Sequence, residues 1–170
     1  MTTEESAVQP LDRGQLAVYF ALMETSSLLQ FAVEQQLRAD GDISWVQFQI
    51  LAGLNDLPSG AQRMTDVADR VVYSRSGLTY QARELEKAGY VRRAADKTDE
   101  RATVLTITRK GRALVRRILP GHIAVVREML LDHLDAREAT EMTRVLSAVR
   151  DKMRASPPRS SRTRRANRAR

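Results

Sequence analysis

Few side chains in this sequence could act as nucleophiles, acid–base catalysts or metal ligands. The chain contains two histidines and no cysteine, which removes thiolate chemistry, disulfide bonds and cysteine-based redox sensing. Glu128 and Asp132 are four residues apart on one predicted helix, whereas His133 points elsewhere and His122 lies further back. The chain therefore offers too few suitable side chains to build a catalytic metal site or a catalytic triad. We expect no enzyme activity, no metal site and no cofactor.

A group of polar side chains in the middle of the chain is more informative. The residues from Ser74 onward predict a helix with Ser74 as N-cap and with Leu78, Ala82 and Leu85 facing inward. The first two turns leave polar side chains facing outward, and such side chains can hydrogen-bond base edges in the major groove of DNA. They are Arg75, Ser76, Thr79, Tyr80 and Arg83. Gly77 would allow close backbone approach, and Ser74 with the helix N-terminus could hold a phosphate.

The distribution of charge also favours a polyanionic partner. The formal net charge is +7, but residues 1–60 hold 2 basic and 8 acidic side chains, whereas residues 61–117 hold 14 and 7. Residues 156–170 hold six arginines and no acidic group. A basic block within an otherwise acidic or neutral chain is typical of a surface that displaces counterions from nucleic acid. Taken by itself, the charge distribution is equally consistent with a basic surface that is merely solvated.

Hydrophobic periodicity predicts a mainly helical chain around this polar stretch. The expected helices cover residues 11–39, 44–57, 65–71, 74–88, 108–133 and 135–153, with strands near 91–95 and 103–107. Ser44 with Gln47 and Asp135 with Glu138 should form capping boxes. Gly41 should stop the first helix, Gly89 should end the helix over 74–88 in a left-handed cap, and Pro120 should kink a later helix. The helices over 65–71 and 74–88 have helix-turn-helix spacing, and the two strands predict a hairpin with a charged tip.

The outer helices carry more apolar surface than one small core requires. Residues 11–39 bear two apolar stripes, and residues 142–153 bear another. We expect one face of the first helix to meet a second copy of the chain, although burial within a monomer would give the same pattern. No uninterrupted apolar run reaches membrane-spanning length and no export signal is evident, so we expect a cytoplasmic protein without a membrane partner. The arginine-rich residues 156–170 should be disordered.

Taken together, these segments resemble the MarR family of multiple-antibiotic-resistance regulators over roughly residues 11–153. The resemblance lies in SWVQFQIL (44–51), MTDVADRV (64–71), SRSGLT (74–79), LEKAGYV (85–91) and DER (99–101), followed by LTIT (105–108) and Gly111. Tyr80 and Gln81 depart from the family pattern, which often has a basic and an apolar residue there. The arginine tail is not a general family feature either.

The resemblance implies roles for further residues. Arg101 at the hairpin tip would enter a minor groove and Asp99 would position it, in keeping with the attraction of a narrow minor groove for a guanidinium. Phosphate contacts, which set affinity without reading sequence, are expected from Arg92, Arg93, Lys97 and Arg109. A small aromatic or lipophilic effector would bind near the dimer helices. Its candidate contacts are Tyr19, Met23, Trp45 and Phe48, for which a plain core role is the alternative.

The expected fold class is mainly α with a small β-hairpin wing, a winged helix-turn-helix flanked by dimerisation helices. The expected division is a flexible N-terminus (1–10), N-terminal helices (11–60), a DNA-binding lobe (61–110), C-terminal dimerisation helices (111–155) and a basic tail (156–170). The expected function is a homodimeric, nucleoid-associated repressor that reads a pseudo-palindromic operator in double-stranded DNA and is released by an effector. A sequence-independent nucleoid protein is the main alternative, and a protein-interaction winged helix is the third.

Overall fold

A computed structural model describes residues 9–96, 98–99 and 101–155. Its helices are α1 (Arg13–Gly41), α2 (Trp45–Asn55), α3 (Met64–Arg70), α4 (Arg75–Lys87), α5 (Arg109–Met129) and α6 (Ala136–Ala155), with a 3-10 turn, η1 (Leu131–His133), before α6. The strands are β1 (Ala61–Arg63), β2 (Val91–Ala95) and β3 (Thr103–Ile107). The predicted flexible N-terminus, apart from its last two residues, and the predicted disordered tail lie outside the described residues.

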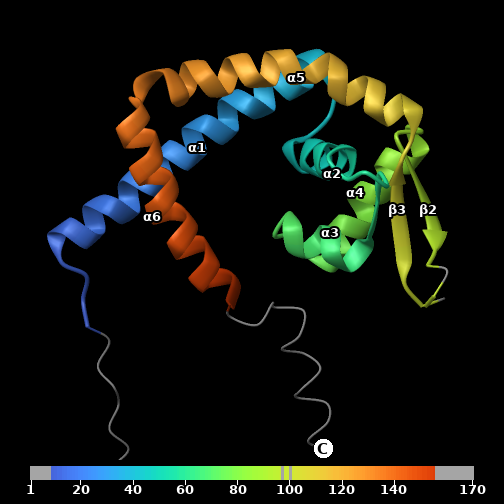
Figure 1. Cartoon of the computed structure of the whole chain (residues 1–170), viewed down its shortest axis with the longest axis horizontal. Helices are drawn as coiled ribbons and strands as arrows, with labels where there is room; N and C mark the ends of the chain where they lie inside the picture. Colours follow the sequence, from blue (N-terminus) through green and yellow to red (C-terminus); the bar gives the residue numbers. More distant parts are fainter. Residues whose placement is uncertain (1–8, 97, 100, 156–170) are drawn as a thin grey trace, which may run out of the picture.

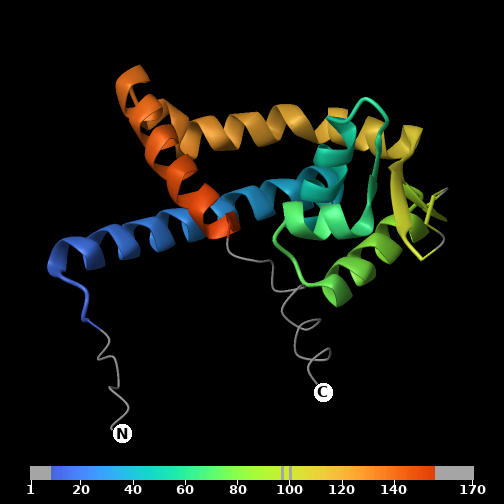
Figure 2. The same ribbon diagram turned by 60° about the horizontal axis from the view of Figure 1, so that its bottom comes forward.

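The chain forms a small lobe attached to an arm of long helices. Figure 1 shows α5 along the top, with the C-terminal part of α1 packed against it and the N-terminal part of α1 sloping away; α2, α3, α4 and the sheet are gathered beneath one end of this pair. We call the part from α2 to β3, residues 45–107, the small lobe. At the far end of the arm the chain turns, and α6 crosses α1 and ends on the side of the small lobe (Figures 1 and 2).

Only the C-terminal part of α1 joins the core. Asp12 begins the helix in a capping box with Gln15, and Val33 and Leu37 are its buried residues. From residue 11 to residue 28 every side chain is exposed, so the apolar stripe expected to continue through Val18 and Leu22 is not covered within this chain. The left-handed residue that ends α1 is Asp42 (φ 50°), not Gly41, which is the last helical residue.

By length and composition α1 is apolar enough to cross a membrane. The sequence-based expectation considered only uninterrupted apolar runs. Glu24 and Ser26 interrupt the apolar run within α1, but the helix as a whole remains apolar. The same helix ends in the core, where Gln36 donates to the Ile118 carbonyl of α5 over 3.3 Å. Its N-terminal apolar surface therefore needs a partner outside the described fold.

The core of the small lobe is formed where α2 meets α4, α5 and the sheet. Ser44 and Gln47 form the predicted capping box at the start of α2, and the helix buries Phe48, Ile50, Leu51 and Leu54. The fully buried side chains include Leu37, Leu78, Leu85, Leu105 and Ile118, which come from four separate elements, α1, α4, β3 and α5. Burial of such a side chain stabilises the fold by roughly 1.5–3 kcal/mol, so this cluster holds the lobe to the arm.

The sheet has one strand more than the predicted hairpin. The strand order is β1-β3-β2, with both pairs antiparallel. β2 and β3 begin and end at the predicted residues, with Val91 opposite Ile107 and Ala95 opposite Thr103. β1 was not predicted, and it pairs Ala61 with Thr106 along the other edge of β3. The hairpin is therefore hydrogen-bonded to the chain that leads into α3.

Two glycines shape the junctions of the lobe. Gly89 adopts a left-handed conformation (φ 76°) after α4, as predicted. Thr108 caps α5 by accepting from the Gly111 N–H. A Cβ on Gly111 would lie 2.3 Å from the Tyr90 carbonyl oxygen, so only glycine allows the base of the hairpin to pack against α5.

The last helix contributes nothing to the core of a single chain. Asp135 and Glu138 form the predicted capping box through bonds of 2.8 and 2.9 Å, and α6 then runs to Ala155 without one buried residue. Its predicted apolar stripe includes Val145, Leu146 and Met153, all exposed. α5 continues as a helix through Pro120.

Candidate nucleic-acid interface

Helix α4 separates an apolar inner face from a polar outer face. Leu78, Ala82 and Leu85 are almost completely buried, whereas the outer side chains of the first three turns are open to solvent. The exposed residues of this face are Arg75, Ser76, Tyr80 and Arg83. Among the described residues neither Arg75 nor Arg83 forms an ion pair, so both guanidinium groups are available to a ligand.

Two of the predicted contacts are engaged within the helix itself. Ser74 Oγ accepts from the Gly77 N–H at 3.2 Å, which makes it the N-cap. Thr79 Oγ1 donates to the Arg75 carbonyl over 2.8 Å, and Thr79 is half-buried. A hydroxyl bonded to the backbone of its own helix can still form a second hydrogen bond, but Thr79 is less open than Ser74, Arg75 and Ser76, which are exposed.

Contacts within the chain explain why residue 77 is a glycine. A Cβ at this position would lie 2.5 Å from Cε1 of Tyr73 and 2.9 Å from Ser74 Oγ. The Tyr73 ring thus packs against the first turn of α4 where a larger residue would displace it. The preceding residue, Val72, has a φ of 53° and an exposed fraction of 81%, so the turn between α3 and α4 is tight and strained.

The hairpin tip is held by residues that sequence reasoning did not single out. Arg63 at the end of β1 donates through Nε to Asp96 (2.9 Å) and through Nη2 to Thr98 Oγ1 (3.2 Å). Asp96 Oδ1 also accepts from the backbone N–H groups of Thr98 and Asp99. The hydrogen bond from Arg63 holds the pKa of the Asp96 carboxyl well below its usual range. These bonds connect the tip to the start of α3.

The Asp99 side chain contacts the backbone of Arg101. Asp99 Oδ1 accepts from the Arg101 N–H at 3.1 Å, and the Arg101 side chain is exposed. The Asp99 carboxylate therefore stabilises the turn that carries Arg101 and does not bind the Arg101 guanidinium. Lys97 lies outside the described residues.

The predicted phosphate contacts differ in their surroundings. Arg93 is bound to Glu86 of α4 through Nε (2.7 Å) and through its backbone N–H (3.0 Å), and the side-chain bond lowers the pKa of Glu86. Arg93 thus fastens β2 to α4, a role that the charge pattern alone did not indicate. Arg92 and Arg109 are exposed, on β2 and on the first turn of α5.

The four candidate effector contacts fall into two separate groups. Trp45 and Phe48 stack at 6.0 Å, and Trp45 donates its backbone N–H to Glu34 of α1 over 2.8 Å. Tyr19 and Met23 are exposed and lie further along α1. Met23 precedes Glu34 by eleven residues, a separation of about 16 Å along a helix. One chain therefore does not bring the two groups together.

His122 joins the first of these groups. Its ring lies 4.6 Å from Phe48 and 6.0 Å from Trp45, between centroids. Burial lowers the pKa of the imidazole, and Nδ1 is buried with no hydrogen-bond partner among the described residues. Sequence reasoning considered His122 only as a catalytic group, because its aromatic neighbours on α2 are distant in sequence.

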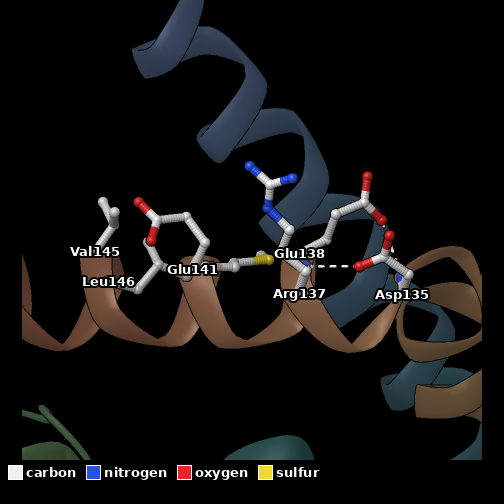
Figure 3. A pocket seen from close by; sticks show the side chains of 7 residues that line it. Asp135, Arg137, Glu138, Glu141, Val145 and Leu146 are labelled. Carbon is white, nitrogen blue, oxygen red and sulfur yellow. Dashed lines mark hydrogen bonds between the residues drawn. The ribbon is translucent and has the colours of Figure 1, made fainter.

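An open hollow lies along α6. Figure 3 shows its lining side chains, all from α6 and its cap. They are Asp135, Arg137, Glu138, Glu141, Met142, Val145 and Leu146. Because one helix supplies the whole lining, the hollow is an uncovered helix face and not an enclosed ligand cavity. Within the described ranges no group of three or more acidic or histidine side chains could hold a metal ion.

Comparisons with known proteins agree with this arrangement. The MarR family model matches residues 42–102, from the start of α2 through the hairpin tip. The regulator MhqR of Bacillus subtilis is 33% identical over 85 residues, which span 49% of this chain and 59% of that protein. The repressor YetL of the same organism is 25% identical over 125 residues, 74% of each chain.

Solved structures extend the likeness to the long helices. Sco3205 of Streptomyces coelicolor, a MarR family regulator in complex with DNA, is 28% identical with a TM-score of 0.80, covering 85% of this chain and 90% of that one. AbsC of the same organism is 26% identical with a TM-score of 0.81, covering 87% and 99%. These relatives are transcriptional regulators, not enzymes. Residues 42–102 thus match the MarR family model, and over most of its length the chain is similar to MarR family transcriptional regulators of solved structure.

Proposed function

We propose that this protein is a homodimeric transcriptional regulator that binds a pseudo-palindromic DNA operator through α4. The observation that carries the proposal is the outer face of α4, where Arg75, Ser76, Tyr80 and Arg83 are exposed above a buried stripe. A helix held from behind by its apolar face presents its polar residues rigidly, which suits direct contacts with base edges in a major groove.

The hairpin supplies the second contact of each subunit. Arg101 stands exposed on a tip that Arg63 and Asp96 fasten to the lobe. A positioned guanidinium at the end of a narrow hairpin can enter a minor groove, where the negative potential is highest. Arg92 and Arg109 contact phosphates beside it, and Arg93 acts by holding the hairpin against α4.

Dimerisation covers the apolar faces of the arm. Val18, Phe20 and Phe31 of α1 are 61–70% exposed, and Met153 of α6 is 72% exposed. Large exposed apolar side chains on both helices favour an interface there, and both helices belong to the arm and not to the small lobe. A two-fold dimer of the arms would place two copies of α4 on one side of the duplex.

We further propose that the protein represses transcription until an aromatic or lipophilic effector binds beside Trp45, Phe48 and His122. These three rings lie where α2 of the small lobe meets α5 of the arm. A ligand there would shift the lobe against the arm and change the spacing of the two reading helices. Tyr19 and Met23 would contribute to such a site only if the partner subunit brings them near.

The proposal is tested by measuring sequence discrimination. A duplex selected from a random pool by the purified protein should bind at least about 10³-fold more tightly than a scrambled duplex of equal length at moderate salt. Equal affinity for both duplexes would instead identify a sequence-independent nucleoid protein. No binding to either would favour a winged helix that recognises proteins.

A further inference from the structure

Tyr80 is an exposed aromatic side chain in the middle of the outer face of α4. Its exposed fraction is 61%, and Figure 2 shows α4 along the lower edge of the small lobe. Steps of four, three and four residues place the outer side chains on one line along the helix. They are Ser76, Tyr80, Arg83 and Lys87. Because the buried side chains of α4 lie on the opposite face, Tyr80 is directed away from the core of its own lobe.

Packing within one chain does not account for an aromatic residue at this position. The other aromatic rings of the small lobe all have a partner inside the chain, and they are Trp45, Phe48, Tyr73 and Tyr90. The Tyr90 ring, for example, has Lys110 Nζ 4.9 Å from its centre. Among the described residues the Tyr80 ring has no such aromatic or cationic partner. Its surface is therefore open to a partner from outside the chain.

The charged groups beside Tyr80 suit a polyanionic partner. Arg83 forms no ion pair within the part of the chain that the structure describes. The neighbouring carboxylate, Glu84, is ion-paired with Lys87 over 2.7 Å, so its charge is offset and it repels phosphates less. On the other side of the ring the preceding turn carries only the small side chain of Ser76. The edge of a base pair can therefore reach the Tyr80 ring.

The chemistry of tyrosine selects which base edge this ring can recognise. Tyrosine combines an apolar ring with one polar group at its tip. In the major groove the base edges present hydrogen-bonding groups and one kind of apolar group, the C5-methyl group of thymine. An aromatic ring in this groove therefore buries apolar surface best against that methyl group. An arginine or a lysine at the same place would instead favour guanine, whose edge offers two acceptors.

We infer that Tyr80 is a specificity-determining residue that recognises the C5-methyl group of a pyrimidine in the major groove. The inference rests on the proposed function, in which α4 reads a DNA operator. Thymine is the natural base that carries this group, and 5-methylcytosine carries the same methyl group at the same place. One position of each half-site is therefore read as methylated or unmethylated at C5, whichever of the two pyrimidines stands there.

The experiment uses the full chain and the duplex that it selects from a random pool. Each thymine of a half-site is replaced in turn by deoxyuridine, which removes only the C5-methyl group. At the position that responds, cytosine and 5-methylcytosine are then compared. The protein variants are Tyr80→Ala, Tyr80→Phe and Tyr80→Arg, with melting curves as the control for folding. Val72→Ala is the matched control, because Val72 is an exposed apolar residue just before α4.

At one thymine of the half-site, deoxyuridine should weaken binding by the parent about fourfold, the effect expected for burial of one methyl group. Tyr80→Phe and Val72→Ala should keep this ratio, and Tyr80→Ala should abolish it. The parent should bind 5-methylcytosine about fourfold more tightly than cytosine at the same position. Tyr80→Arg should select guanine there when it is given a random pool.

A selected half-site without thymine, or equal affinity for thymine and deoxyuridine at every position, would overturn the inference while leaving the proposed function intact. So would a preference for the methyl group that Tyr80→Ala retains or Val72→Ala removes, because another side chain would then read it. Loss of the preference in Tyr80→Phe would assign the recognition to the hydroxyl group and would also overturn the inference. Failure of the full chain to select any sequence would count against the proposed function instead.

Discussion

The two exposed arginines of the reading surface, Arg75 on α4 and Arg101 on the hairpin, are predicted to have different effects on DNA recognition. Arg75→Ala removes a side chain that can donate two hydrogen bonds to one base, so binding should weaken by about 1–3 kcal/mol and preference should relax at one position per half-site. Arg101→Ala should reduce discrimination for A·T-rich flanks outside the half-sites. Sequence selection with each variant beside the parent measures both effects.

Neither substitution should lower the melting temperature, because both side chains are exposed and lie off the buried stripe. Melting curves therefore serve as the control for folding. If all three proteins selected the same motif with the same affinity, neither α4 nor the hairpin would read DNA in the proposed way.

The backbone conformation of Val72 leads to a prediction about stability at the level of a single residue. A β-branched residue with φ of 53° is strained, and its exposed side chain gains little packing in return. Val72→Asn and Val72→Gly should each raise the free energy of unfolding by about 0.5–1.5 kcal/mol, with Val72→Ala as the control that keeps a Cβ. Denaturant titration measures this. A loss of stability in both variants would show that packing by Val72 outweighs its backbone strain.

At the level of elements, the hairpin depends on Arg63 and Asp96 for its position. Asp96→Asn removes the ionic bond to Arg63, so amide hydrogen exchange within residues 96–102 should become faster and DNA affinity should fall several-fold. Exchange in α4 should not change, which separates loss of the tip from general unfolding. Unaltered exchange at the tip would mean that the strand pairing alone holds the hairpin.

The same ion pair predicts how the hairpin responds to pH. The pKa of Asp96 is lowered in the fold, so its stabilising effect is complete above the pKa of the unfolded chain and is lost only as the pH falls through the lower folded value. Exchange protection at the tip should therefore stay constant from about pH 8 to pH 5. A midpoint near pH 6 would indicate control by another group.

The base of the hairpin requires a glycine at position 111. Gly111→Ala would place a methyl group 2.3 Å from the Tyr90 carbonyl oxygen, a backbone atom that cannot rotate away. We expect a loss of roughly 2–4 kcal/mol of stability. Gly14→Ala, in an exposed part of α1 where the nearest atom is an Asp12 side-chain oxygen at 3.3 Å, is the matched control and should be neutral or stabilising.

Local signals account for the elements that the sequence predicts well. The capping boxes at Ser44 and Asp135, the left-handed Gly89 and both hairpin strands depend on residues near one another in the chain, and the structure confirms them. β1 was missed because a three-residue strand exists only through its pairing with β3. Asp42 replaced Gly41 as the left-handed cap, which is possible because Asp tolerates that conformation.

Contacts between distant residues explain why the site was predicted less completely. The outer face of α4 follows from helical periodicity, so its exposed residues could be found from sequence. The pairing of Arg93 with Glu86, the anchoring of Asp96 by Arg63 and the place of His122 beside Phe48 join separate elements. No local pattern contains that information.

For the whole molecule, the exposed stripe of α6 should determine the oligomeric state. Val145→Glu introduces a charge into that stripe, so the dimer should dissociate and DNA affinity should fall by at least about tenfold. Thr140→Glu adds the same charge on the opposite face of α6, and it should leave the dimer intact. Sedimentation at micromolar concentration measures both variants. A parent protein that sediments as a monomer, with or without DNA, would contradict the dimer.

The most direct test of the account is the symmetry of the DNA sequence that the full chain selects from a random pool. Two copies of α4 related by a two-fold axis should select an inverted repeat with half-site centres about 10 base pairs apart, bound by two chains per duplex. Arg75→Ala should relax the same position in both halves. A selected motif without dyad symmetry, or the absence of any motif, would contradict reading by paired α4 helices.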